Sequence, residues 1–509
     1  MSSALDNKRI LKNTFALYFR QIITLCIGLY TSRMVLRELG VEDYGINAVV
    51  GGLIAICSFI SGSLVQTLNR YFSFELGKEN YEKLNKIFNI ALVLYAVIAL
   101  ISLILAETIG LWFLQNKMVI PLDRLNSALW VYQFSVAGMC LFLILTPYMS
   151  IVVSREKFKV FAYMSIFDAI MKLLIVYFLV FINFDKLKLL SVLNFSVSCL
   201  VFLIYRIYCI SNFKETVFKL CIEWNLYKDL LKFSAWMLLN PISYTAKYEG
   251  VNMVFNLFFG PVVNAANAIA SKVTQVIGSF ISDASQAVNP QIIKLYASGN
   301  FNDMWSLVIR ASKMYYLLFF NLALPVIVNA EFVLSVWLGN VPNYTAVLTQ
   351  LVLVEQIIRT LVLALVQVNN ASGNIKILQI VGCIGQTASL PVAIILCYLG
   401  FDVTSVVITN ILIGILTGFL NCLIIKIQNG LPVFQFLQEL YLPVIKVTFL
   451  SIVVPFIMHY FLPNSTLFSI LNIFTCIIFS CGFSYCFGLS KNEKKKAIGF
   501  VKRKIIALL

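Results

Sequence analysis

The sequence is poor in charge and has a single histidine. Aspartate, glutamate, lysine and arginine make up 12% of its 509 residues, too few to cover the surface of a soluble domain of this size. His459 alone cannot build a zinc site. The 12 cysteines contain no CxxC pair and are interpreted as small packing residues. No metal, cofactor or disulfide framework is therefore expected.

Signatures of catalysis are also missing. The sequence holds no Walker loop, no zincin helix, no GxSxG turn and no run of paired carboxylates. Polytopic membrane enzymes usually place catalysis on a large external loop, and no long external loop is predicted in this sequence. We therefore expect a protein that is not an enzyme and does not draw its energy from ATP.

Long apolar segments are what the sequence has in abundance. Hydrophobic residues make up 60% of the chain, and the mean hydropathy is +0.89. An all-α polytopic membrane protein is predicted, because a helix satisfies its own backbone hydrogen bonds in lipid. Fourteen segments have spanning length: 12–33, 43–67, 87–113, 127–153, 160–183, 187–208, 231–257, 262–286, 313–338, 345–368, 375–398, 403–425, 441–461 and 466–488.

The distribution of lysine and arginine supports this topology. If the N-terminus is cytoplasmic, 27 of the 39 basic residues fall on the cytoplasmic side, six outside and six within the spans. This positive-inside bias predicts that both termini are cytoplasmic. It also accounts for most of the net charge of +16 without a nucleic-acid partner. The alternative is a twelve-span topology with one pair of segments misassigned.

An internal repeat relates the two halves of the chain. A shift of 220 residues pairs Gly40 with Gly260, Asn47 with Asn267, Ala48 with Ala268, Gln66 with Gln286 and Asn69 with Asn289. Six helices per half give both halves the same orientation, as in carriers that rock one half against the other. We predict six-helix lobes at 1–210 and 228–428, a further helix pair at 440–489 and a basic tail at 490–509. The alternative is chance similarity among apolar helices.

Polar residues form seams along the first, second, seventh and eighth segments. Two seams in each half are expected to enclose one water-filled cavity, since a helix facing lipid has no reason to keep them. Pro241, in the seventh segment, is expected to kink or hinge that helix. The candidate cavity-lining residues are Asn47, Asn69, Asn240, Asn264, Asn267, Gln275 and Gln286.

Charges within the spans fall into two classes. Asp168 and Lys172 lie four residues apart on one predicted helix, and so do Glu355 and Arg359. Opposite charges at this spacing stand next to each other on a helix. A structural ion pair is therefore predicted for each couple.

The other embedded charges are candidates for function. Arg20, Lys247 and Lys272 have no acid at helical spacing on their own face, so we interpret them as cavity cations that bind an anionic substrate. Pairing with another helix, or snorkelling of the side chain, is the alternative. Glu249 and Asp283 are the candidate residues for ion coupling.

The sequence resembles the multidrug/oligosaccharidyl-lipid/polysaccharide exporter superfamily over essentially its whole length. Within that superfamily it is most similar to the bacterial polysaccharide repeat-unit flippases of the Wzx type. The resemblance is carried by SRMVLRELGVEDYGINAVVGGLI (32–54), FGPVVNAANAIASKVTQVIGSFISDASQAVNPQIIKLYASGN (259–300) and WLGNVP (337–342).

The resemblance implies a V-shaped, two-lobed fold and alternating access. The implied activity is transfer of an undecaprenyl-diphosphate-linked oligosaccharide across the bacterial inner membrane, for O-antigen, capsule or exopolysaccharide. Membrane lipids, a polysaccharide polymerase and glycosyltransferases are the further partners expected. By position, Arg20, Lys247 and Lys272 would contact the diphosphate or an acidic sugar.

The alternative function is an ion-coupled multidrug or small-molecule efflux carrier of the same fold. Drug exporters of the superfamily often carry an acid in the first helix, and this sequence has none between Leu11 and Ser32. Peptidoglycan-precursor flippases carry two arginines there, whereas Arg20 stands alone within this span. Both departures favour the polysaccharide branch and leave the coupling ion open.

Overall fold

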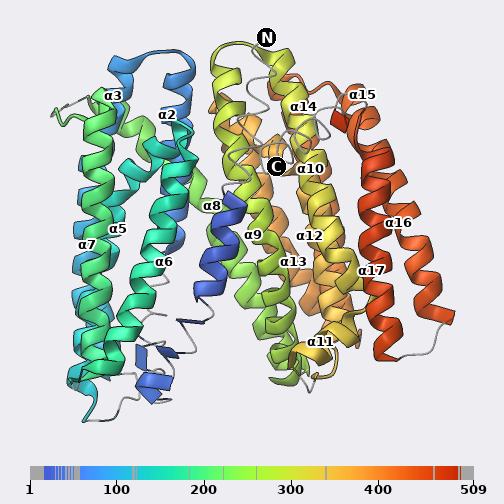
Figure 1. The fold of residues 1–509 in the computed structure, drawn as a ribbon. Helices are drawn as coiled ribbons and strands as arrows, with labels where there is room; N and C mark the ends of the chain where they lie inside the picture. Colours follow the sequence, from blue (N-terminus) through green and yellow to red (C-terminus); the bar gives the residue numbers. More distant parts are fainter. Residues whose placement is uncertain are drawn as a thin grey trace, which may run out of the picture. The chain divides into compact units, whose positions relative to one another are not determined.

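The computed structural model describes most of the chain between residues 17 and 494. It describes 17–28, scattered positions from 30 to 50, and 58–494 apart from 117–120, 122, 183, 220, 222, 260, 339–340, 462–464 and 491–492. All regular structure in these parts of the chain is helical (Figure 1). The predicted all-α membrane class is therefore confirmed.

Ten of the described helical segments are long and apolar enough to cross a membrane. They coincide with ten of the fourteen predicted spans. The described α-helices from residue 58 onward, those of the ten segments included, are α2 (Ser58–Gly77), α3 (Tyr81–Leu105), α4 (Leu111–Asn116), α5 (Leu125–Ser154), α6 (Phe158–Phe181), α7 (Lys186–Asn212), α8 (Trp224–Phe259), α9 (Pro261–Ala297), α10 (Phe301–Val328), α11 (Ala330–Leu338), α12 (Thr345–Ser372), α13 (Lys376–Tyr398), α14 (Val403–Asn429), α15 (Val433–Phe436), α16 (Leu442–Phe461) and α17 (Thr466–Phe483).

The four remaining predicted spans are the polar ones. Helices α8 and α9 occupy the seventh and eighth, and their polar residues keep them outside the ten apolar helices. The first is represented by a helix over Leu17–Gly28. Much of the second lies outside the described residues, although α2 covers its end.

The chain divides into two compact units. The first contains Met1–Pro241 and Gln286–Gly299, and the second contains Ile242–Ser285 and Asn300–Leu509. The boundaries therefore fall within α8, directly after Pro241, and within α9. Each of these two helices contributes residues to both units. The lobe limits predicted from the sequence, 1–210 and 228–428, stay predictions.

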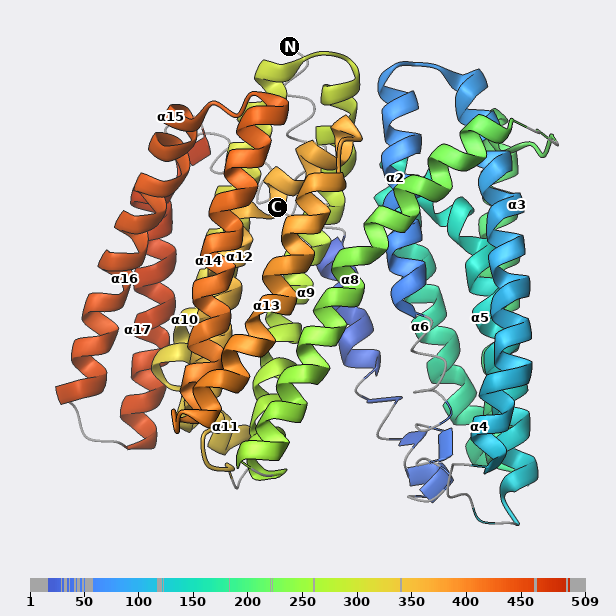
Figure 2. The same cartoon turned by 180° about the vertical axis from the view of Figure 1, so that it is seen from behind.

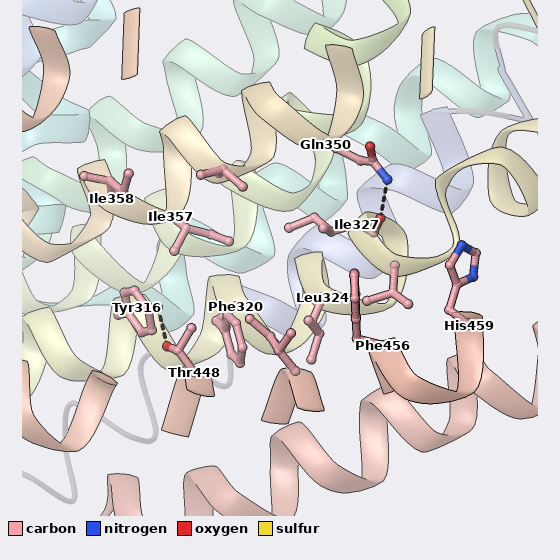
Figure 3. A pocket seen from close by; sticks show the side chains of 13 residues that line it. Tyr316, Phe320, Leu324, Ile327, Gln350, Ile357, Ile358, Thr448, Phe456 and His459 are labelled. Atoms are coloured by element: carbon pink, nitrogen blue, oxygen red, sulfur yellow. Dashed lines mark hydrogen bonds between the residues drawn. The ribbon is translucent and has the colours of Figure 1, made fainter. Parts of the chain in front are cut away.

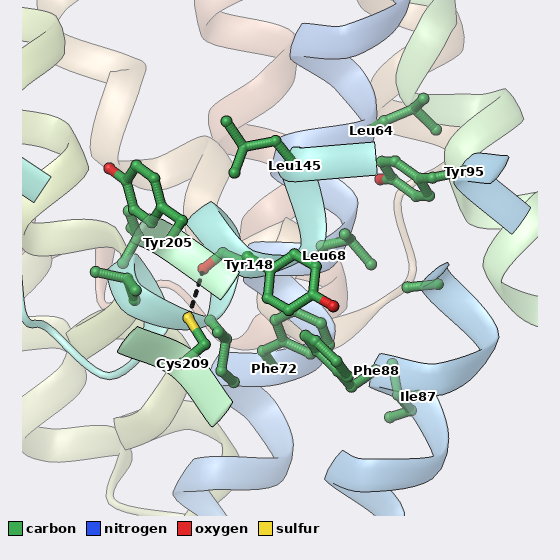
Figure 4. Close-up of a cluster of buried hydrophobic side chains, with 14 of the residues drawn as sticks. Leu64, Leu68, Phe72, Ile87, Phe88, Tyr95, Leu145, Tyr148, Tyr205 and Cys209 are labelled. Atoms are coloured by element: carbon green, nitrogen blue, oxygen red, sulfur yellow. Dashed lines mark hydrogen bonds between the residues drawn. The ribbon is translucent and has the colours of Figure 1, made fainter. Parts of the chain in front are cut away.

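The first unit has an aromatic and aliphatic core where α2, α3, α5 and α7 meet (Figure 4). Phe88 stands edge-on to Tyr148, with ring centroids 5.3 Å apart. Leu68 and Phe72 from α2 are fully buried beside them. Ala287, near the end of α9, belongs to the same cluster, which explains why this end of α9 groups with the first unit.

The core of the second unit joins the α8–α9 hairpin to α12, α13 and α14 (Figure 2). Phe255 of α8 and Ala266 and Ala270 of α9 are fully buried. They pack with Leu348 of α12 and Val407 of α14 in one cluster. These apolar contacts hold the α8–α9 hairpin against the other three helices.

The repeat seen in the sequence recurs in the helix ends. Helices α3 and α10 begin 220 residues apart, and each is capped by an asparagine, Asn80 or Asn300, that accepts a hydrogen bond from the backbone three residues later. The residue before each cap has a left-handed backbone, with φ of +56° at Glu79 and +73° at Gly299. Matching turns at the same offset strengthen the interpretation that the two halves are equivalent.

The left-handed turn before α10 should respond to loss of its glycine. Changing Gly299 to alanine places a Cβ in a left-handed residue and should cost about 1 kcal/mol of unfolding free energy. The change Gly278→Ala is the control, because a Cβ there meets nothing within 4 Å inside a helix, and it should stabilise by about 0.5 kcal/mol. Thermal unfolding of the purified protein in detergent measures both. Equal effects of the two changes would contradict the assignment of this turn.

Candidate functional site

The α8–α9 hairpin brings two of the predicted cations to one level. The side chain of Asn267 donates a hydrogen bond to Asn252 across the hairpin, at 2.9 Å. Asn252 lies five residues after Lys247, and Asn267 lies five residues before Lys272. In an antiparallel helix pair this register places the two lysines at the same height. Asn267 itself is 5% exposed, so this predicted cavity residue holds the hairpin together.

Lys247 forms an ion pair with a neighbouring helix. Its ammonium group lies 2.9 Å from a carboxylate oxygen of Glu355 on α12, and the two side chains are 14% and 11% exposed. Pairing between helices was the alternative left open for this lysine. A buried cation needs such a counter-charge, because removing an isolated charge from water has a large free-energy cost.

The predicted pair between Glu355 and Arg359 is corrected by this contact. Glu355 pairs with Lys247, and the guanidinium of Arg359 lies over the ring of Tyr244 on α8, 5.3 Å from the ring centroid. The guanidinium is planar and weakly hydrated, so an aromatic face suits it better than it suits an ammonium. Spacing in the sequence can reveal only partners on the same helix, whereas the partners of Glu355 and Arg359 both lie on α8.

Lys272 occupies a more open position on α9. Its side chain is exposed and donates a hydrogen bond to Gln275 at 3.4 Å. With Lys247 and Arg359 it gives this part of the second unit three cations, against the one described carboxylate of Glu355. The side chains of Glu249 and Asn264 lie outside the described residues. Among the side chains described here, cations outnumber carboxylates, which suits an anion.

The remaining predicted cation, Arg20, belongs to the first unit. Its guanidinium lies 5.1 Å from the ring centroid of Phe161 on α6 and donates a hydrogen bond to Gln21 at 3.4 Å. On the same helix α6, Asp168 and Lys172 form the predicted ion pair, with 2.7 Å between nitrogen and oxygen. That prediction is confirmed.

The other predicted site residues are distributed over both units. Asn47, Asn69, Asn240 and Gln286 are half-buried in the first unit. Asp283 is 6% exposed in the second unit. Their role as cavity lining or ion coupling stays a prediction.

Sequence reasoning missed an ionic cluster at the connection before α5. Arg124 binds Asp43 through two hydrogen bonds and reaches Asp185 at 3.4 Å. Ser127 donates to Asp185 at 2.5 Å, and this carboxylate also caps α7. Burial raises the pKa of Asp185, but the hydrogen bonds from Ser127 and from the backbone of α7, with the charge of Arg124, outweigh it and lower the pKa. The only sign of this cluster in the sequence is Asp185, an aspartate directly before a predicted helix.

A cavity of about 630 Å³ lies within the second unit between α10, α12 and α16 (Figure 3). Its lining is mainly aliphatic and aromatic. Its polar groups include Tyr316, which lies 2.6 Å from the hydroxyl of Thr448, and Gln350, which donates to the backbone of Ile327 at 2.8 Å. His459, at the end of α16, lies at one edge of the cavity (Figure 3). Tyr316, Thr448 and Gln350 already have partners and the wall is mostly apolar, so this cavity offers no chemistry comparable to that of the cation site.

Comparison with known proteins gives a consistent answer at the level of fold. No protein-family model and no curated protein matches the sequence. Solved structures match it along most of its length. A multidrug resistance MATE family transporter of the MOP superfamily, in an outward-facing conformation, superposes with a TM-score of 0.73 at 12% identity, over 84% of this chain and 97% of that one. The chain has the MATE fold.

Two further solved structures also superpose on this chain. A MOP superfamily transporter from Pyrococcus furiosus gives a TM-score of 0.70 at 12% identity, over 83% of this chain and 96% of that one. A MATE transporter from Vibrio cholerae gives 0.65 at 15% identity, over 84% and 99%. At such identity the likeness concerns the fold alone, and the substrate has to be argued from the site.

The ion pair between α8 and α12 should show strong coupling when its partners are changed. Glu355→Gln alone leaves the buried ammonium of Lys247 without its partner and should cost about 3 kcal/mol of stability, whereas Lys247→Gln should cost less, because Arg359 lies one turn from the carboxylate that remains. The double variant removes both charges and should recover most of this loss. Thermal unfolding of the four proteins in detergent gives the coupling free energy. Additive losses would show that the two side chains do not interact.

The ionic cluster at Asp185 predicts a pH dependence. Because its pKa is lowered on folding, its stabilisation is present above the unfolded value of about 3.9 and is lost as the pH falls through the folded value. Asp185→Asn should therefore cost about 1–2 kcal/mol at pH 7 and progressively less below pH 4. Unfolding midpoints measured across this range test the prediction, and a pH-independent loss would contradict it.

Proposed function

We propose that this protein translocates an undecaprenyl-diphosphate-linked oligosaccharide across the bacterial inner membrane by alternating access, with both termini in the cytoplasm. The observation that supports the proposal is the set of cations on α8, α9 and α12. Lys247 and Lys272 stand at one level of the hairpin, and the guanidinium of Arg359 lies over the ring of Tyr244, three residues before Lys247. A diphosphate carries the opposite charge and several strong acceptor oxygens.

The free energy of placing cations in a membrane supports an anionic substrate. Each cation placed at membrane depth costs at least about 2.5 kcal/mol on insertion scales, so its retention requires a compensating role. Glu355 compensates one of the three cations of this site. A bound diphosphate would compensate the others while its lipid tail stays in the bilayer. A polysaccharide polymerase and glycosyltransferases are the partners that such a flippase would serve.

Replacing the exposed cation of the site tests the proposal. Lys272→Gln removes a charge without disturbing a buried pair, and should lower surface polysaccharide about tenfold through the loss of one charge-assisted hydrogen bond. Lipid-linked precursor should accumulate on the cytoplasmic side. The double variant Asp168→Asn, Lys172→Gln is the matched control, because it removes a charge pair from α6 in the first unit. Normal polysaccharide in the Lys272 variant, at normal protein level, would count against the proposal.

One observation favours a second candidate, an ion-coupled efflux carrier of the same fold. Asp283 is a carboxylate 6% exposed within α9, the kind of group that can carry a proton across a membrane. Drug sensitivity of a deletion strain whose surface polysaccharide is intact would favour this second function over the first.

A further inference from the structure

The ion pair between Lys247 and Glu355 raises a question about how an anion could reach the lysine. The two side chains are nearly buried and already neutralise each other at 2.9 Å. A diphosphate that binds Lys247 has to displace the carboxylate of Glu355. A displaced carboxylate left without a partner in this environment would cancel the gain from binding.

A second partner for that carboxylate lies on the same helix. Arg359 follows Glu355 by four residues on α12, so the two side chains stand one turn apart on one face. An acid that precedes a base by four residues is the favourable order for such a pair, because it agrees with the helix dipole. In the structure the guanidinium rests over the ring of Tyr244, which is 43% exposed. A cation held over a partly exposed ring is held weakly compared with one paired to a carboxylate.

We propose that Glu355 is an exchangeable counter-anion, which pairs with Lys247 in the empty carrier and with Arg359 when an anionic headgroup occupies Lys247. The exchange needs side-chain rotations on α12 and no movement of its backbone. Every charge keeps a partner in both states, so loading does not strand a buried ion. The proposal rests on the proposed function for the class of ligand, a diphosphate, and assigns Glu355 and Arg359 to a site in which only the lysines were expected.

The exchange also defines what the site selects. An uncharged or cationic molecule cannot replace the carboxylate at Lys247, because the displaced pair would gain nothing in return. When an anion binds Lys247, the carboxylate of Glu355 pairs with Arg359 instead. Lys272 is exposed at the same level and can bind further phosphate oxygens. Glu355 is therefore a specificity-determining residue that acts by competing with the substrate.

Binding of inorganic pyrophosphate to the purified full-length protein, measured by calorimetry in detergent, tests the exchange. Glu355→Gln removes the competitor and should tighten binding about tenfold, a change of about 1.4 kcal/mol. Arg359→Gln removes the second partner of the carboxylate and should weaken binding by a similar factor. In the double variant, loss of Arg359 should have no further effect, because no carboxylate remains to be displaced. Asp168→Asn is the matched control, since it breaks an ion pair of the first unit and should leave binding unchanged.

The outcomes separate this proposal from the function on which it rests. If Arg359→Gln weakens binding equally with and without Glu355, the arginine contacts the anion directly and the exchange is refuted. If Glu355→Gln weakens binding or leaves it unchanged, Glu355 is not a competitor and the exchange is again refuted, while binding by the wild type upholds the anion site. If the wild type does not bind pyrophosphate and the Lys272 variant makes normal polysaccharide, both proposals fail. Should Glu355→Gln not fold, Glu355→Asp keeps the charge, lengthens the ion pair and should tighten binding by a smaller factor.

Discussion

A lysine inside a membrane-spanning bundle needs a counter-charge, and the arrangement of the second unit's site follows from how that need is met. Lys247 pairs with Glu355 of α12, and this ion pair connects the α8–α9 hairpin to α12. The buried cluster around Phe255 packs the same helices together on their apolar faces. The apolar contacts provide most of the burial, and the ion pair fixes which faces of α8 and α12 meet. Tyr244 and Arg359 are brought together as a consequence, since each lies about one turn from a member of the pair.

Much of the fold could be predicted from the sequence because it depends on local patterns. Apolar length located ten spanning helices, and the constant offset of 220 residues was visible in rare residues such as asparagine and glutamine. The offset recurs in the structure at Asn80 and Asn300, where the helix caps depend on the same local chemistry. Asp168 and Lys172 were also predictable, because a partner four residues away on the same helix is a local property.

The site was less predictable because its contacts are made between helices. Spacing suggested that Glu355 would pair with Arg359, and nothing in the sequence of α12 indicates that Lys247, more than 100 residues earlier, is closer. The lysines themselves could be selected, since a charge without a local partner is unusual in a span. The common height of the two lysines could not be predicted, because it depends on the register that Asn252 and Asn267 set across the hairpin. Asn267 was expected to line a cavity, and its hydrogen bond with Asn252 is a structural role.

The way α8 and α9 are shared between the units bears on how a charge exchange could be linked to transport. The boundary in α8 follows Pro241, which removes a backbone hydrogen bond from the helix interior and weakens resistance to bending there. Tyr244 and Lys247 follow within two turns, on the second unit's side of that boundary. At the other boundary, Gln291 and Lys294 of α9 both bind Glu156, whose carboxylate is almost fully buried in the first unit. In the proposed exchange, an anion that draws Lys247 away from Glu355 would loosen α8 from α12 close to its proline, while the far end of α9 would stay anchored. A carrier that must change its shape only when loaded needs a contact of this kind, one that the substrate itself weakens.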